Sequence, residues 1–237
     1  MANSLSIKDR IEQGEVVLLC IAALTFPFSV AACNIALGTC LIIGLLNGDY
    51  IAGLRHVWQH HRSLSIAWMA YLALFPIGLL WSLDVDRGLQ IIGRQWFWLL
   101  TPLVIQLLGS TDRRRLFFLA LSAGLSLHLV FCVAQFYGLV TLIGKGGSTA
   151  TNPTGFIGHT SFGLVYGIWA AFLVHWSLFL NGWQRWTTRL LALWAVGMIF
   201  LSSGRGFLSH APALLALGGT SFGKELVRWH GCSLSGG

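Results

Sequence analysis

The feature that most constrains this chain is a succession of apolar segments separated by short polar segments that carry most of its charge. An α-helix needs about 20 apolar residues to cross the hydrocarbon of a bilayer, and several of these segments approach that length. The segments are residues 16–46, 64–81, 95–109, 116–140, 161–180, 190–201 and 207–219. This pattern predicts an all-α, polytopic transmembrane bundle that occupies residues 1–237 as a single domain.

Composition agrees with a membrane environment. Of the 237 residues 55% are hydrophobic and only 10% are charged, and the mean hydropathy is +0.72. Soluble domains carry about 25% charged residues, and a soluble fold must keep its exterior wet. The 11 Trp and 15 Phe also fit, because aromatic residues collect at membrane interfaces.

The first apolar segment, residues 16–46, is longer than one span and shorter than two comfortable ones. Pro27 and Asn34 interrupt it, so we expect a tight helical hairpin that turns near residues 31–34. The alternative is one long tilted helix. With the hairpin the chain has about eight transmembrane helices.

The basic residues predict the orientation. With the N-terminus inside, eleven of the fifteen fall on the cytoplasmic side and four on the outer side, as the positive-inside rule requires. The eleven are Lys8, Arg10, Arg55, Arg62, Arg113, Arg114, Arg115, Arg185, Arg189, Lys224 and Arg228, and the four are Arg87, Arg94, Lys145 and Arg205. A single first helix would leave nine basic residues on the cytoplasmic side and six on the outer side. We expect both termini to be cytoplasmic in a multi-pass protein, and because the charge lies in short clusters, we expect no nucleic-acid partner.

Arg205 is the candidate with the clearest chemistry. It lies in the sequence LSSGRGFL between two apolar segments, at the predicted outer face. An Arg this close to hydrocarbon usually has a partner or a task. The planar guanidinium suits a phosphate group, and the flanking Gly204 and Gly206 allow close backbone approach. The alternative is an Arg that extends to lipid headgroups.

His159 ends the second of two predicted outer loops, residues 82–94 and 141–160. It could make a polar contact at the outer face as a base or a phosphate donor, or be an ordinary interfacial histidine. The pair His56 and His60 is spaced for one helix face, but no further ligand follows, so no metal site is expected. We also expect the cysteines to pack in apolar surroundings, and His128, His175 and His210 to pack or hydrogen-bond to their neighbours. Gly163 and Gly167 are expected to mark a helix contact.

The second half of the chain has an outer loop that ends in FIGHTSFG, followed by a helix, a basic inner segment, a further helix and the sequence SSGRG. In this arrangement it resembles the O-antigen ligase and polymerase family. The resemblance is strongest over residues 155–217. It implies a protein of the bacterial inner membrane that acts on a glycan linked to undecaprenyl pyrophosphate, which the ligases transfer to lipid A–core without a metal or other cofactor. It also implies that Arg205, with Gly204 and Gly206, binds the lipid pyrophosphate.

The chain departs from the family after its eighth expected helix. Family members have about twelve helices, and a large later periplasmic loop supplies their catalytic histidine. No counterpart of that loop is present, His159 does not match the histidine in position, and the polar tail resembles a truncated end. We therefore assign no catalytic residue and expect no glycan transfer by this chain alone. The alternatives are a non-catalytic membrane protein, a small-solute carrier, or an enzyme that a separately encoded C-terminal half completes.

Overall fold

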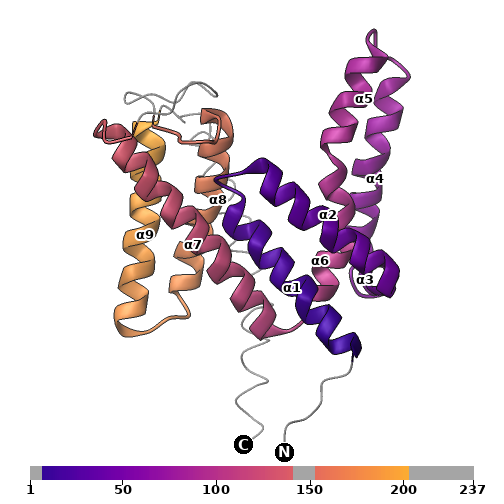
Figure 1. The fold of residues 1–237 in the computed structure, drawn as a ribbon, viewed down its shortest axis with the longest axis horizontal. Helices are drawn as coiled ribbons and strands as arrows, with labels where there is room; N and C mark the ends of the chain where they lie inside the picture. Colours follow the sequence, from indigo (N-terminus) through magenta and orange to yellow (C-terminus); the bar gives the residue numbers. More distant parts are fainter. Residues whose placement is uncertain (1–6, 141–152, 203–237) are drawn as a thin grey trace, which may run out of the picture. The chain divides into compact units, whose positions relative to one another are not determined.

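The computed structural model describes residues 7–140 and 153–202, and all the elements within these ranges are helical (Figure 1). The helices are α1 (Ile7–Thr25), α2 (Val30–Asn47), α3 (Asp49–His60), α4 (Arg62–Leu79), α5 (Val85–Arg94), the 3₁₀ helix η1 (Trp96–Leu100), α6 (Thr101–Leu107), α7 (Thr111–Phe136), α8 (His159–Ser177) and α9 (Gly182–Leu201). The all-α prediction is confirmed for these residues. The helices form two compact units, residues 1–124 and 125–237, which divide within α7.

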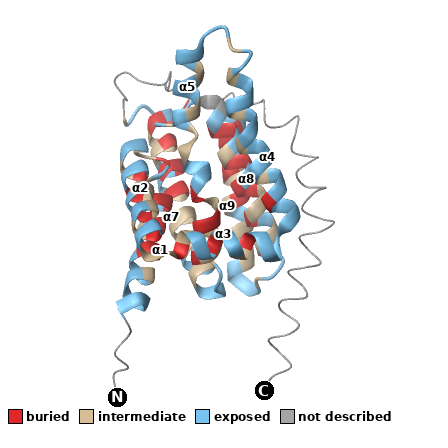
Figure 2. Cartoon of the chain, turned by 90° about the vertical axis from the view of Figure 1, so that its right-hand side faces the viewer, coloured by how far each residue is buried: buried red, intermediate tan, exposed pale blue. Residues whose placement is uncertain are grey.

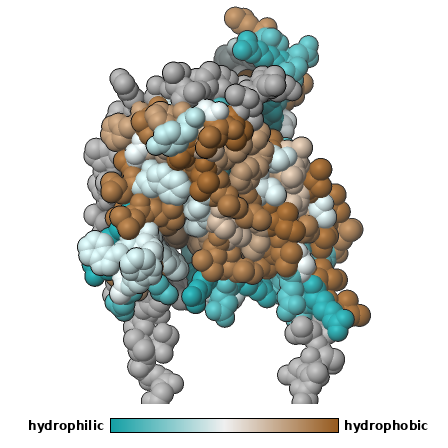
Figure 3. Space-filling model, turned by 60° about the vertical axis from the view of Figure 1, so that its left-hand side comes forward, coloured by the Kyte–Doolittle hydropathy of each residue, from teal (hydrophilic) through white to brown (hydrophobic). Residues whose placement is uncertain are grey.

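Three of the described helices, α2, α4 and α7, are long and apolar enough to cross a membrane. Much of their surface is not covered by protein. Only 6% of α4 is buried, and α4 is largely exposed in Figure 2. The face drawn in Figure 3 is correspondingly apolar over most of its described surface. Exposed apolar area of this extent suits a lipid environment.

The first apolar segment is a hairpin, as predicted, and the single long helix is wrong. The turn comes earlier than expected, between Thr25 and Val30, and Asn34 lies inside α2. The side chain of Ser29 explains this position, because its Oγ accepts a hydrogen bond from the Ala32 amide at 3.2 Å and so caps α2. Pro27, in the turn, has no amide hydrogen to continue α1.

Two further expectations from hydropathy are corrected. The predicted outer loop of residues 82–94 is mostly helix α5, which begins where the Asp84 carboxylate accepts a hydrogen bond from the Arg87 amide at 2.9 Å. The predicted span of residues 95–109 is a 3₁₀ turn followed by the short helix α6, with Pro102 at the start of α6. This apolar segment is therefore two short helices in succession and not the one continuous helix that hydropathy predicts.

In the first unit α1 packs on α2, and α3 packs on α6. Val16, Leu19, Cys40, Leu100, Leu103 and Leu107 form its main buried cluster. Gly48 connects α2 to α3 with a φ of +82°, a conformation that glycine adopts without steric cost. At Gly53 the two backbones approach closely, since a Cβ there would lie 2.4 Å from the carbonyl oxygen of Pro102.

In the second unit α8 packs on α9, and buried residues follow one side of α8. Gly163 and Gly167 lie on that buried side, which confirms the predicted helix contact. Arg185 and Arg189 lie within α9 and not in a loop, and Arg189 Nε donates a hydrogen bond to Ser177 Oγ at 3.3 Å. The predicted span of residues 207–219 and the C-terminal tail lie outside the described residues.

Candidate functional site

A buried polar cluster occupies the second unit where α7 faces the loop before α8. We call it the His128 cluster; its members are His128, Cys132 and Gln135 of α7, Gly155 and Phe156 of the loop, and Tyr166 of α8. His128, Cys132, Gln135 and Tyr166 are all buried. Residues 128, 132 and 135 are three or four positions apart, so one face of α7 presents them together.

Hydrogen bonds fix the tautomer of His128. The Tyr166 hydroxyl donates to the carbonyl oxygen of Leu125 at 3.1 Å, so it must accept from His128 Nδ1, which lies 2.7 Å away. The other ring nitrogen, Nε2, then accepts from the Phe156 amide at 3.4 Å. A neutral imidazole provides one donor and one acceptor, and both are used.

The same cluster holds the loop against α7. Gln135 Oε1 accepts from the Gly155 amide at 3.2 Å, one residue before the contact of Phe156 with His128. Gly155 has a φ of +59°, and a Cβ at this position would lie 2.4 Å from His128 Nε2. The Phe156 ring stacks on Phe131, with 5.2 Å between ring centroids. Two backbone hydrogen bonds and one aromatic contact therefore position the chain immediately before α8.

The predicted site residues relate to this cluster as follows. His159 is the first residue of α8, three residues after Phe156, and the structure describes its backbone only. Arg205, Gly204 and Gly206 lie outside the described residues. The prediction that His128 packs or hydrogen-bonds to its neighbours is confirmed, as is the apolar packing of Cys33 and Cys40. Cys132 is also buried, but its Sγ lies 3.7 Å from His128 Nδ1.

A separate apolar cavity of about 480 Å³ lies in the first unit between α3, α4 and α6. Val57, Trp58, Trp68 and Pro102 are among its lining residues, and Arg55 also lines it. Such a lining suits a hydrocarbon chain more than a polar substrate.

Sequence reasoning missed one buried group. Glu15 lies at the middle of α1 and is fully buried, and no pattern in the sequence singled it out. A partial signal was the spacing of Glu15, Leu19 and Ala22, which share the buried face of α1.

These features define a helical protein with segments suited to a membrane, in which α7 and a buried histidine position a loop. Comparison with protein-family profiles, with curated proteins and with solved structures found no match to the chain.

Proposed function

We propose that this chain is an O-antigen-ligase-like, multi-pass protein of the bacterial inner membrane that binds the pyrophosphate of an undecaprenyl-linked glycan at the outer face. The observation that carries the proposal concerns the motif FIGHTSFG. Its first residue, Phe156, is held by His128, and its remainder forms the loop end and the first turn of α8. A motif held in this way by buried polar contacts is typical of a binding loop on a rigid scaffold.

The orientation of the helices supports the same proposal. The basic residues Arg113, Arg114 and Arg115 lie in the first turn of α7, so the positive-inside rule assigns this end of α7 to the cytoplasm. The His128 cluster involves the later part of α7, and the start of α8 is then on the outer side. Arg205 follows α9 in the sequence, and the same rule predicts it on the outer side, where the family's ligases meet their lipid-linked glycans.

The proposal concerns binding of the lipid-linked donor and assigns no catalytic residue. His128 is excluded as a general base in its present contacts, because its acceptor nitrogen is already hydrogen-bonded to a backbone amide. Membrane lipids are the other expected partners, and the apolar cavity beside Trp58 and Trp68 suits their hydrocarbon chains.

The test is photo-crosslinking of the full chain, in nanodiscs, to an undecaprenyl-pyrophosphate analogue. We expect Arg205→Ala to weaken binding by roughly 10- to 150-fold, which corresponds to the 1.5–3 kcal/mol of a hydrogen bond to a charged group. Arg205→Lys should weaken it nearly as much, because Lys lacks the planar bidentate donor pair. Arg87→Ala, which removes an exposed arginine of α5, is the matched control and should bind normally.

Equal crosslinking of the wild type and both Arg205 variants would return this residue to a headgroup contact and remove the proposal.

A further inference from the structure

Glu15 of α1 is a buried carboxyl group in the first unit. Glu15 is 0% exposed, and neither of its carboxyl oxygens has a hydrogen-bond partner among the residues that the structure describes. The carboxyl group lies over Gly44 of α2, where a Cβ would be 3.2 Å from Glu15 Oε1 and 2.7 Å from Leu103 Cδ2 of α6. The absence of a side chain at Gly44 provides its space.

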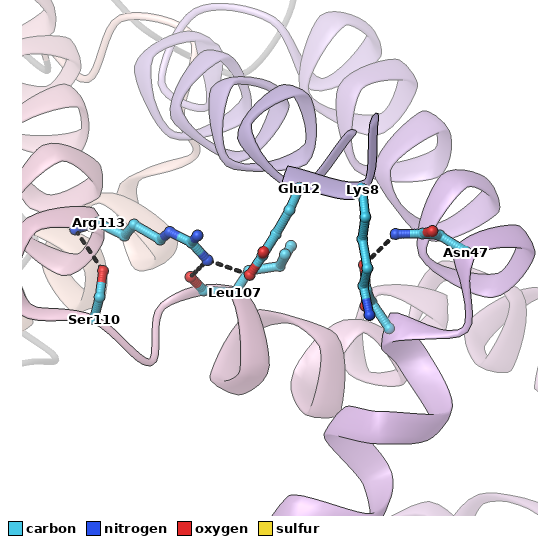
Figure 4. Close-up of polar contacts among 7 residues, drawn as sticks. Lys8, Glu12, Asn47, Leu107, Ser110 and Arg113 are labelled. Carbon is cyan, nitrogen blue, oxygen red and sulfur yellow. Dashed lines mark hydrogen bonds and ion pairs between the residues drawn. The ribbon is translucent and has the colours of Figure 1, made fainter. Parts of the chain in front are cut away.

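Asp49, the first residue of α3, is the neighbouring buried carboxylate and is 5% exposed. Unlike Glu15, it has donors of its own. Asn47 Nδ2 donates to Asp49 Oδ2 at 2.5 Å, and Lys8 Nζ lies 3.8 Å from Asp49 Oδ1 (Figure 4). The amide end of α3 also favours negative charge at this position.

Among residues 7–140 and 153–202, the cations nearest these carboxyl groups are paired with acids other than Glu15. Arg113 of α7 pairs with Glu12 and also contacts the carbonyl oxygen of Leu107 (Figure 4). Lys8 is 68% exposed on its side chain and is engaged with Asp49. The charged groups that act on Glu15 are Asp49 of α3 and Glu12 of α1, and the Cys40 thiol of α2 contacts the Glu15 backbone oxygen. The cations beside these two carboxyl groups are Lys8, which lies near Asp49, and Arg113, which pairs with Glu12. Two carboxyl groups therefore interact in a site with too few donors for both to be ionised.

One proton resolves this conflict. A protonated carboxyl group is a hydrogen-bond donor as well as an acceptor, so neutral Glu15 can donate to the Asp49 carboxylate. We propose that Glu15 and Asp49 form a binding site for a single exchangeable proton between α1 and α3, with the proton carried by Glu15. A metal ion would need further oxygen ligands, and Asp49 already spends its oxygens on Asn47 and Lys8.

The electrostatic surroundings agree with this assignment. Glu15 precedes the apolar run that begins at Val16, so it lies outside the membrane-spanning segments. Burial, and after it the charge of Asp49, raises the pKa of the Glu15 carboxyl from its ordinary value of 4.5 to about 7. Proton exchange with water requires access to a fully buried group, so it is coupled to a movement of α1 away from Gly44.

The site is tested with dicyclohexylcarbodiimide, an apolar reagent that modifies protonated carboxyl groups in apolar surroundings. The full chain in nanodiscs is treated across a range of pH, and the modified peptides are identified by mass spectrometry. We expect labelling at Glu15 that declines as the pH rises through about 7, and its absence in Glu15→Gln. Asp86→Asn, at an exposed acid of α5, should leave the label unchanged.

Asp49→Asn tests the pair itself. Removal of the Asp49 charge should move the labelling midpoint of Glu15 to lower pH, because that charge raises the pKa of Glu15. No label at Glu15 at any pH, protection by sodium ions, or an unchanged midpoint in Asp49→Asn would each overturn the proposal. Labelling of the wild type is read at a defined peptide, so the result stands even if Glu15→Gln fails to fold. None of these outcomes affects the lipid-binding proposal, which rests on other residues.

Discussion

The imidazole of His128 on α7 donates from Nδ1 to the hydroxyl of Tyr166 on α8, across 2.7 Å, in a part of the second unit where both residues are fully buried. This hydrogen bond fixes the ring so that Nε2 faces the amide of Phe156. The loop before α8 thereby depends on a contact between two helices.

Removal of the Tyr166 hydroxyl should destabilise the second unit. Tyr166→Phe leaves His128 Nδ1 without its acceptor in a buried site, and an unsatisfied buried donor costs about 1–3 kcal/mol. We expect a lower unfolding temperature in detergent micelles, measured by tryptophan fluorescence. Tyr137→Phe, at a residue that is 71% exposed, is the matched control, and an equal effect of the two variants would contradict the role given to Tyr166.

Gly155→Ala should displace the loop. The new methyl group would lie 2.4 Å from His128 Nε2. The alanine would also have to adopt a φ of +59°, which costs a non-glycine residue roughly 1 kcal/mol or more. We expect faster proteolysis near residue 155 and weaker crosslinking to the lipid analogue. Gly158→Ala is the comparison, since no atom lies within 4 Å of its Cβ position and its φ is −62°; if both variants behaved like the wild type, the loop would not be held as described.

Gly53→Ala should separate α3 from α6. Its methyl group would approach the Pro102 carbonyl oxygen to 2.4 Å, and a backbone atom cannot move aside as a side chain can. Overpacking of this kind typically costs about 1–3 kcal/mol, which thermal unfolding should register. Gly14→Ala in α1, with open space around it, should instead be neutral or stabilising by about 0.5–1 kcal/mol.

Stability should fall with rising pH because of Glu15. Below its ordinary pKa of 4.5 the carboxyl group is neutral in the folded and the unfolded chain, whereas between 4.5 and about 7 only the unfolded chain releases the proton. The unfolded state then binds fewer protons, so the free energy of unfolding decreases over this interval and levels off above it. The Glu15→Gln variant should lose this part of the pH dependence; parallel curves for the two proteins would contradict the prediction.

Topology is tested by fusions at the C-terminus. Lys224 and Arg228 follow the last expected span, so a C-terminal fluorescent protein should be bright and a C-terminal phosphatase inactive. The reverse pattern would exclude a cytoplasmic C-terminus and with it the eight-span arrangement.

Hydropathy predicted the helical class and the first hairpin, because both follow from the distribution of apolar residues along the chain. It misplaced the hairpin turn, although the capping serine Ser29 was a readable signal. It also missed α5, since a polar amphipathic helix has the same composition as a loop. The signals that distinguish the two were the cap at Asp84 and the helical spacing of Val85, Leu89 and Ile92. The contact of His128 with Tyr166 joins residues 38 positions apart, and no local pattern encodes such a separation.

Glu15 was missed for a different reason. A hydropathy boundary is drawn at the first charged residue, which assumes that a charged group seeks water. Here α1 extends on both sides of Glu15, and Gly44 of α2 leaves room for the carboxyl group. The space depends on a residue 29 positions later, so the sequence of α1 alone could not reveal it.

The close approach of α3 to α6 at Gly53 also bears on how the protein is made. During synthesis from the N-terminus, α3 leaves the ribosome before α6, so the surface that receives Pro102 exists by the time α6 emerges. A seven-residue helix gains too little from lipid to insert by itself. The insertion of α6 therefore depends on contact with α3, which is already in place. A substitution at Gly53 would then impair insertion of the chain before it reduced the stability of the folded protein.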